Sequence, residues 1–170
     1  MSDIELVTAW RRNDPKHAVD ANAFWEKMGV LTPQEREARA GKLGVLAYRD
    51  GQLIAITSAD IVWVEGVRQR FASIGALVDP QHWRKGLAAR MTGRLRSILE
   101  VWSLENPDEK VMGYAAIVQG DFGERAEEPV WHDWGVDLTL VGYTPKDEQI
   151  RIHWFQHARV SRGAGKGDPG

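Results

Sequence analysis

The chain has 170 residues, of which 43% are hydrophobic and 27% are charged, and its formal net charge at pH 7 is −2. That length fits one domain with a self-sufficient core, and the slightly acidic balance excludes a protein that binds polyanions over its whole surface. The absence of cysteine excludes disulfides, thiolate nucleophiles and cysteine-ligated zinc. The sequence does not open like a signal peptide and has no apolar run of membrane-spanning length, so we expect a cytoplasmic protein without membrane contact.

The first third of the chain predicts one strand followed by two helices. Residues 4–10 have the pattern of a strand. Residues 13–29 have the signals of a helix, with Asn13 or Asp14 as the cap, Pro15 in the first turn and Gly29 at the end. Residues 32–41 repeat these signals, and the Thr32–Glu35 spacing predicts a capping box.

The middle of the chain predicts three antiparallel strands, a long helix and a further strand. Two segments rich in Val, Ile, Ala and aromatic residues, 43–66 and 67–80, contain the strands, and Asp50-Gly51 is typical of a hairpin turn. Apolar residues then recur at the period of a helix, at Leu87, Met91, Leu95, Ile98, Leu99 and Trp102. The next strand, at residues 110–119, would complete a right-handed βαβ unit.

The last third of the chain has weaker signals. Residues 123–134 are compatible with a short helix or an irregular loop, and residues 136–144 and 150–160 predict two closing strands. Residues 161–170 are polar and rich in glycine, which predicts a flexible tail. We therefore expect a single domain over residues 1–160.

The most informative segment joins the fourth predicted strand to the third predicted helix. It places Arg84, Lys85 and Gly86 where the helix begins, although cations are poor partners for a helix N-terminus. Glycine allows a ligand to approach the backbone, and the first N–H groups of a helix have no partner inside the helix. These residues predict an anion site that suits a pyrophosphate. The alternative is a tight strand–helix junction with solvated basic side chains.

The order of the elements and this turn together resemble the GNAT superfamily of acyl-CoA-dependent N-acyltransferases. The stretch VDPQHWRKGLA, from Val78 to Ala88, is similar to the family signature V-x-P-x-x-[R/Q]-x-x-G-x-[G/A]. Trp83 is the one departure, since the family usually has Arg or Gln there. The resemblance implies an α/β fold with a mixed, mainly antiparallel sheet, a central βαβ cofactor-binding unit and helices on both faces.

The resemblance also implies where acetyl-CoA would bind. The strand residues that would pair with the pantetheine arm are Ala76, Leu77 and Val78. The residues that would surround the pyrophosphate are Trp83, Arg84, Lys85, Gly86, Leu87, Ala88 and Ala89. A slot for the thioester would open between the fourth and fifth strands, where small residues such as Gly113 and Ala115 stand.

The residues for proton transfer depart from the family pattern. Trp131 or one of its neighbours stands about where many members have a tyrosine acid, and the fourth strand has no Glu or Asp where some members have a base. An amine must lose a proton before it attacks a thioester, either to a side chain or through water. The candidates are His132, Asp133 and Asp121, with Asp60 and Glu65 as further carboxylates.

The resemblance thus implies an enzyme that transfers an acetyl group from acetyl-CoA to an amine by direct attack, without a metal. The alternative is a non-catalytic acyl-CoA-binding or sensing module of the same fold, which the missing acid and base favour. A nucleotide-binding protein would need an acidic residue for the ribose, and none can be placed. The acceptor is a small-molecule amine or a protein N-terminus rather than a nucleic acid, and the resemblance is compatible with a homodimer.

Overall fold

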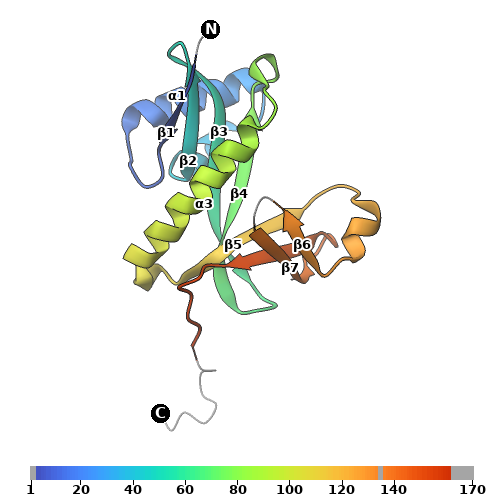
Figure 1. The fold of residues 1–170 in the computed structure, drawn as a ribbon. Helices are drawn as coiled ribbons and strands as arrows, with labels where there is room; N and C mark the ends of the chain where they lie inside the picture. The colour runs from blue at the N-terminus through green and yellow to red at the C-terminus, as the bar shows by residue number, and fades with distance from the viewer. Residues whose placement is uncertain (1–2, 134–135, 162–170) are drawn as a thin grey trace. The chain divides into compact units, whose positions relative to one another are not determined.

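The computed structural model describes residues 3–133 and 136–161 (Figure 1). The three α-helices of these residues are α1 (Pro15–Met28), α2 (Pro33–Ala40) and α3 (Leu87–Glu105). The strands are β1 (Ile4–Thr8), β2 (Leu43–Arg49), β3 (Gln52–Val64), β4 (Gln69–Val78), β5 (Val111–Val118), β6 (Val130–Asp133), β7 (Val136–Tyr143) and β8 (Gln149–Trp154). No helix in these ranges is long and apolar enough to cross a membrane.

The chain forms two compact units. The first comprises Met1–Asp60 and Ser73–Val101, and the second comprises Ile61–Ala72 and Trp102–Gly170. Strands β1, β2, β3 and β4 follow one another in the first unit, and the order in the second is β5-β8-β7-β6. Strands β3 and β4 and helix α3 contribute residues to both units.

Helix α1 begins and ends through local contacts. The Asp14 carboxylate accepts a hydrogen bond from the Lys16 N–H at 2.9 Å, and Pro15 occupies the first helical position. Gly29 ends the helix in the left-handed region, at φ 69°, and its N–H donates to the carbonyl of Glu26 at 3.0 Å. The sequence left open whether Asn13 or Asp14 is the cap, and the structure identifies Asp14.

Helix α2 has the predicted capping box. The Glu35 N–H donates to the Thr32 hydroxyl at 3.2 Å, and the Glu35 carboxylate accepts from the Thr32 N–H at 2.7 Å. No residue of α2 is buried, so this helix lies on the surface of the first unit. Its last turn carries Arg39, a favourable position for a cation.

The core of the first unit lies between α1 and the strands. Phe24 and Trp25 of α1 are 4% and 2% exposed and belong to one cluster with Leu46 of β2 and Ile56 of β3. Fully burying such a side chain stabilises a fold by roughly 1.5–3 kcal/mol. In Figure 1, α3 crosses in front of these strands and α1 lies behind them. A side chain at Gly44 would overlap Leu95 of α3, so this helix packs directly on β2.

The second unit is a set of antiparallel strands, in which β8 pairs with β5 and β7, and β7 pairs with β6. Its core cluster contains Phe71, Ala115 and Ile152, which are at most 3% exposed. The mixed α/β class and the mainly antiparallel strands are confirmed.

Two expectations about the last third are corrected. Residues 123–134, expected as a helix or loop, contain a 3-10 helix (Gly123–Glu127) and then strand β6. The closing strand expected at 150–160 ends at Trp154. The tail expected at 161–170 lies outside the described residues except for Ser161, and the single domain expected at 1–160 stays a prediction.

Candidate functional site

The turn after β4 is fixed by a buried aspartate. Asp79 is 2% exposed, and its carboxylate accepts from the Gln81 N–H at 2.9 Å and from the Lys27 ammonium of α1 at 3.1 Å. Its own N–H donates to the carbonyl of Ile54 in β3 at 2.9 Å. The Gln81 N–H, followed by Lys27, holds the pKa of Asp79 below its ordinary value despite burial. The turn is therefore anchored to α1 and to β3.

Gly86 then leads the chain into α3 with a conformation that few other residues adopt. Its φ is +85°, and a Cβ built there would have no other atom within 4 Å. The surface above its backbone is therefore open. The Arg90 N–H closes a helical hydrogen bond to the Gly86 carbonyl at 2.9 Å, so the N–H groups before Arg90 belong to the first turn of the helix. This open backbone at a 19-residue helix provides a place for an anion.

Basic side chains surround the start of α3. Arg84, Lys85 and Arg90 line a depression of about 410 Å³ together with Asp3 from the N-terminal segment. All three basic residues are exposed. This local concentration of positive charge contrasts with the net charge of −2 of the whole chain.

The other predicted cofactor residues differ in accessibility. Trp83 is 66% exposed, and Ala88 and Ala89 are also exposed, whereas Leu87 is 2% exposed and its side chain belongs to the core. The backbone N–H of Leu87 donates to the carbonyl of Arg84 at 3.1 Å. The predicted pantetheine residues lie at the end of β4, where Ala76 is exposed and Leu77 and Val78 are half-buried. The structure thus brings Ala76 to Ala89 into one continuous strand, turn and helix.

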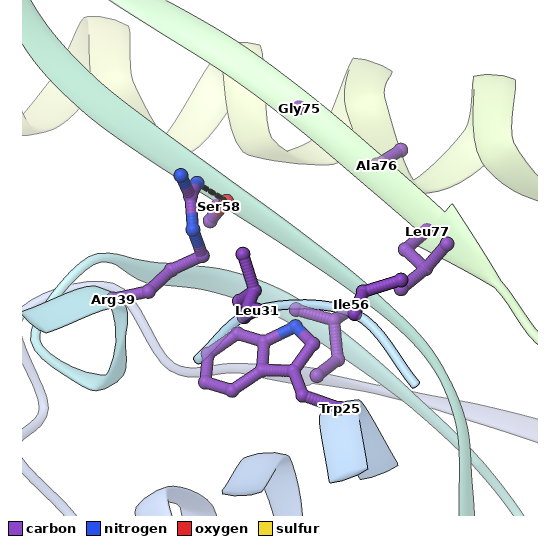
Figure 2. Close-up of a pocket in the computed structure, with 9 residues that line it drawn as sticks. Trp25, Leu31, Arg39, Ile56, Ser58, Gly75, Ala76 and Leu77 are labelled. Carbon is purple, nitrogen blue, oxygen red and sulfur yellow. Dashed lines mark hydrogen bonds between the residues drawn. The ribbon is translucent and has the colours of Figure 1, made fainter. Parts of the chain in front are cut away.

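A pocket of about 270 Å³ lies beside this end of β4 (Figure 2). Its walls come from α1, the α1–α2 loop, α2, β3 and β4, all in the first unit. The side chains that shape it are Trp25, Leu31, Arg39, Ile56, Ser58 and Leu77. Gly75 and Ala76 complete the wall on β4. The pocket is mostly apolar and adjoins the strand that the resemblance assigns to the cofactor.

One end of this pocket is polar. Nη1 of Arg39 donates to the hydroxyl of Ser58 at 3.2 Å, and Figure 2 shows the guanidinium turned toward this hydroxyl. The same Nη1 lies 3.7 Å from the Asp60 carboxylate, whose other oxygen is 2.6 Å from the Lys42 ammonium. Asp60 is thus engaged mainly by Lys42. Ser58 is only 6% exposed, so its hydroxyl gives Arg39 a fixed partner.

The predicted catalytic residues lie in the second unit. His132 projects from β6 with its side chain 75% exposed, and its Nδ1 lies 2.7 Å from a carboxylate oxygen of Asp137, the residue opposite it in β7. Asp133 ends β6 opposite Val136, and its side chain lies outside the described part of the chain. Asp121 is exposed, and its carboxylate accepts from the Gly123 N–H at 2.8 Å.

The burial and contacts of Trp131 indicate a structural role. It is 4% exposed, its indole N–H donates to the carbonyl of Arg125 at 2.7 Å, and the guanidinium of Arg151 lies 3.9 Å from its ring centroid. Arg151 is fully buried and donates to the carbonyl of Glu128 at 2.7 Å, and burial lowers its pKa. Trp131 therefore helps to hold residues 125–131 on the strands of this unit.

The sequence did not identify several residues that the structure brings to these sites. Lys27 reaches Asp79 from 52 positions away, and Arg39 and Ser58 are 19 positions apart. Lys27, Arg39 and Ser58 belong to no motif, so no local signal could have indicated them. Asp137 could have been found, because a hairpin between residues 131 and 138 places it opposite His132.

A comparison with known protein families identifies the family of this chain. Residues 5–104 match the acetyltransferase (GNAT) family. The chain belongs to this family. No curated protein matches the sequence.

Solved structures of GNAT proteins share the fold at low sequence identity. A GNAT-family protein from Desulfovibrio desulfuricans has a TM-score of 0.54 at 13% identity, over 89% of this chain and 97% of that one. The yncA protein of Salmonella typhimurium, solved with its cofactor acetyl-CoA, has a TM-score of 0.53 at 14% identity, over 97% and 100%. The ribosomal-protein-S18-alanine N-acetyltransferase of Escherichia coli has a TM-score of 0.53 at 13% identity, over 96% and 98%. At identities this low, the structural similarity shows only that this chain has the same fold as those proteins.

Proposed function

We propose that this GNAT protein binds acetyl-CoA at the turn from Trp83 to Ala89 and transfers the acetyl group to an amine. The observation that carries the proposal is the open backbone at Gly86, with φ +85° at the start of α3 and flanked by exposed Arg84 and Lys85. Backbone N–H groups at a helix N-terminus together with basic side chains suit a pyrophosphate. The family match, and the acetyl-CoA in the related Salmonella structure, support the choice of this ligand.

The fit of a CoA thioester extends along β4. An extended pantetheine arm needs a strand edge with few obstructing side chains, and Gly75 and Ala76 are small and exposed. These two residues also line the 270 Å³ pocket, which we assign to the acceptor amine. The two partners of the reaction would then meet at the end of β4.

The chemistry we propose has no covalent enzyme intermediate, since the chain has no cysteine. Acetyl-CoA supplies an acyl group activated as a thioester. The neutral amine attacks the carbonyl carbon, a C–N bond forms, the C–S bond breaks, and the proton lost by the amine balances the one gained by the departing thiolate. We propose that water carries the amine proton away, and that His132, Asp133 and Asp121 are the side chains to test as the base.

A non-catalytic acyl-CoA sensor is the competing function. One consideration favours it: Trp131 or one of its neighbours stands about where the family has a tyrosine acid, and Trp131, which is 4% exposed, has no side-chain group acidic enough to protonate a thiolate. A sensor would bind acetyl-CoA at the same turn and release no thiol.

One experiment separates the two functions. Isothermal titration of the purified chain with acetyl-CoA and CoA measures binding, and detection of free thiol with a panel of amines measures transfer. Binding with amine-dependent thiol release supports the enzyme. Binding without release from any amine supports the sensor, and absence of binding refutes both.

A further inference from the structure

The polar side-chain groups that line the 270 Å³ pocket of the first unit are the Arg39 guanidinium, the Ser58 hydroxyl and the Trp25 indole N–H. Arg39 donates through Nη1 to Ser58, and its Nε and Nη2 have no protein partner within residues 3–133 and 136–161. Trp25 is 2% exposed, and its indole N–H also donates to no atom of the described residues. Figure 2 shows the indole nitrogen on the side of the ring that faces Leu31 and Ile56.

Among the described residues, the Arg39 guanidinium meets two acceptors, the Ser58 hydroxyl at 3.2 Å and the Asp60 carboxylate at 3.7 Å, and both approach Nη1. No Asp or Glu is among the described residues that line the pocket. Guanidinium and indole groups can only donate hydrogen bonds, and a carboxylate can only accept them. The Arg39 side chain is 36% exposed, so its Nε and Nη2 are accessible to a ligand that supplies a carboxylate. The polar end of the pocket is therefore complementary to an anion.

The other walls of the pocket limit the polarity and size of the rest of the ligand. Leu31, Ile56 and Leu77 are apolar, as is the face of Trp25. The volume lies below the roughly 300–1,000 Å³ typical of sites for drug-sized ligands. A single guanidinium fits the two oxygens of one carboxylate, whereas binding a phosphate usually involves more positive charge.

We propose that the acceptor is a small amino acid-like amine, which carries a carboxylate bound by Arg39 and a compact apolar side chain. This inference rests on the proposed acetyl transfer and specifies its substrate class. The amine would lie toward Gly75 and Ala76, on the strand assigned to the cofactor. Polyamines fit poorly because their additional ammonium groups would meet apolar walls and the Arg39 guanidinium, with no Asp or Glu among the described lining residues. A protein N-terminus lacks a carboxylate at this distance from its amine.

Matched ligands test the carboxylate directly. L-leucine and L-leucinamide differ at the carboxyl group, and the same holds for the products N-acetyl-L-leucine and N-acetyl-L-leucinamide. Thiol release measures transfer to the first pair and to spermidine. Isothermal titration in the presence of CoA measures binding of the second pair without requiring catalysis.

Arg39→Met provides the matching protein variant. Arg39 is on the exposed helix α2, so we expect the variant to fold, and its thermal unfolding checks this. It should lower kcat/KM for L-leucine about 10- to 100-fold, the loss expected for a charge-assisted pair, and change the value for L-leucinamide less than about threefold. Arg12→Met, which removes an exposed arginine that does not line the pocket, should change neither value.

The outcomes separate this inference from the proposed function. If L-leucinamide or spermidine is acetylated as well as L-leucine, the enzyme assignment stands and the carboxylate site is refuted. If no amine releases thiol but N-acetyl-L-leucine binds through Arg39, transfer is refuted and the carboxylate site stands. Failure of both the amino acid and its product to bind overturns the inference.

Discussion

Replacement of Gly86 by alanine is the sharpest test of the cofactor site. A Cβ at this position would contact no protein atom within 4 Å, so the substitution creates no clash in the free protein. Its cost comes from φ +85°, which an L-residue adopts at an expense of about 1–2 kcal/mol. For a protein of this size that cost corresponds to a decrease in Tm of roughly 2–8 °C.

Gly51 provides a matched control for the same substitution. It has φ +77° in the turn between β2 and β3, and a Cβ there would also have nothing within 4 Å. Gly51→Ala should therefore lower Tm by a similar amount. Any difference in acetyl-CoA binding between the two variants then reports on the ligand rather than on backbone strain.

The expected difference in binding is large. In Gly86→Ala the methyl group would stand where the pyrophosphate approaches the helix N-terminus. The loss of one or two charge-assisted hydrogen bonds, at about 1.5–3 kcal/mol each, weakens acetyl-CoA binding by about 10- to 10⁴-fold. Isothermal titration measures this change. Affinity equal to that of the wild type in Gly86→Ala, or an equal loss in Gly51→Ala, would refute the assignment.

Three further changes test other parts of the structure. Arg84→Ala should weaken acetyl-CoA binding about tenfold at low ionic strength and clearly less near 1 M salt, because salt screens exposed charge pairs. An equal loss of affinity at every salt concentration would contradict a contact between Arg84 and phosphate. Asp79→Asn should reduce the unfolding free energy by about 2 kcal/mol at pH 7. Because the pKa of Asp79 is lowered in the folded state, this difference should persist above pH 4 and shrink below it in urea titrations; a difference independent of pH would refute it. His132→Ala should change kcat/KM less than tenfold, since the side chain is 75% exposed, and a loss of about 10² or more would instead identify it as the base.

Elements with local signals could be predicted from the sequence. The caps of α1 and α2 act within a few residues, and each cap predicted the correct helix boundary. The Asp50-Gly51 turn likewise depends on two adjacent residues, both with positive φ. Strand β6 was missed because four residues after a proline carry almost no pattern of their own. It forms a strand only because β7 supplies its hydrogen-bonding partner.

The candidate site likewise has one part that could be predicted from the sequence and one part that could not. The turn around Gly86 is continuous in sequence, so the anion site could be proposed before the fold was known. The 270 Å³ pocket combines residues from five segments, and its pairing of a guanidinium with apolar walls depends on which groups the fold brings together. Asp60 illustrates this dependence. It could be proposed as a base from its residue type, but the structure places it 2.6 Å from Lys42 and outside the pocket lining.

The walls of this pocket also bear on how the acceptor should lose its proton. An ammonium placed toward Gly75 and Ala76, in a mostly apolar pocket with no carboxylate in the described lining, would be destabilised by desolvation. The amine should therefore enter in its neutral form, after losing its proton to solvent. The value of kcat/KM should then rise with pH toward the pKa of the free amine, with no inflection near neutrality. A plateau reached near pH 7, and abolished in His132→Ala, would instead require a base on the protein and refute solvent deprotonation.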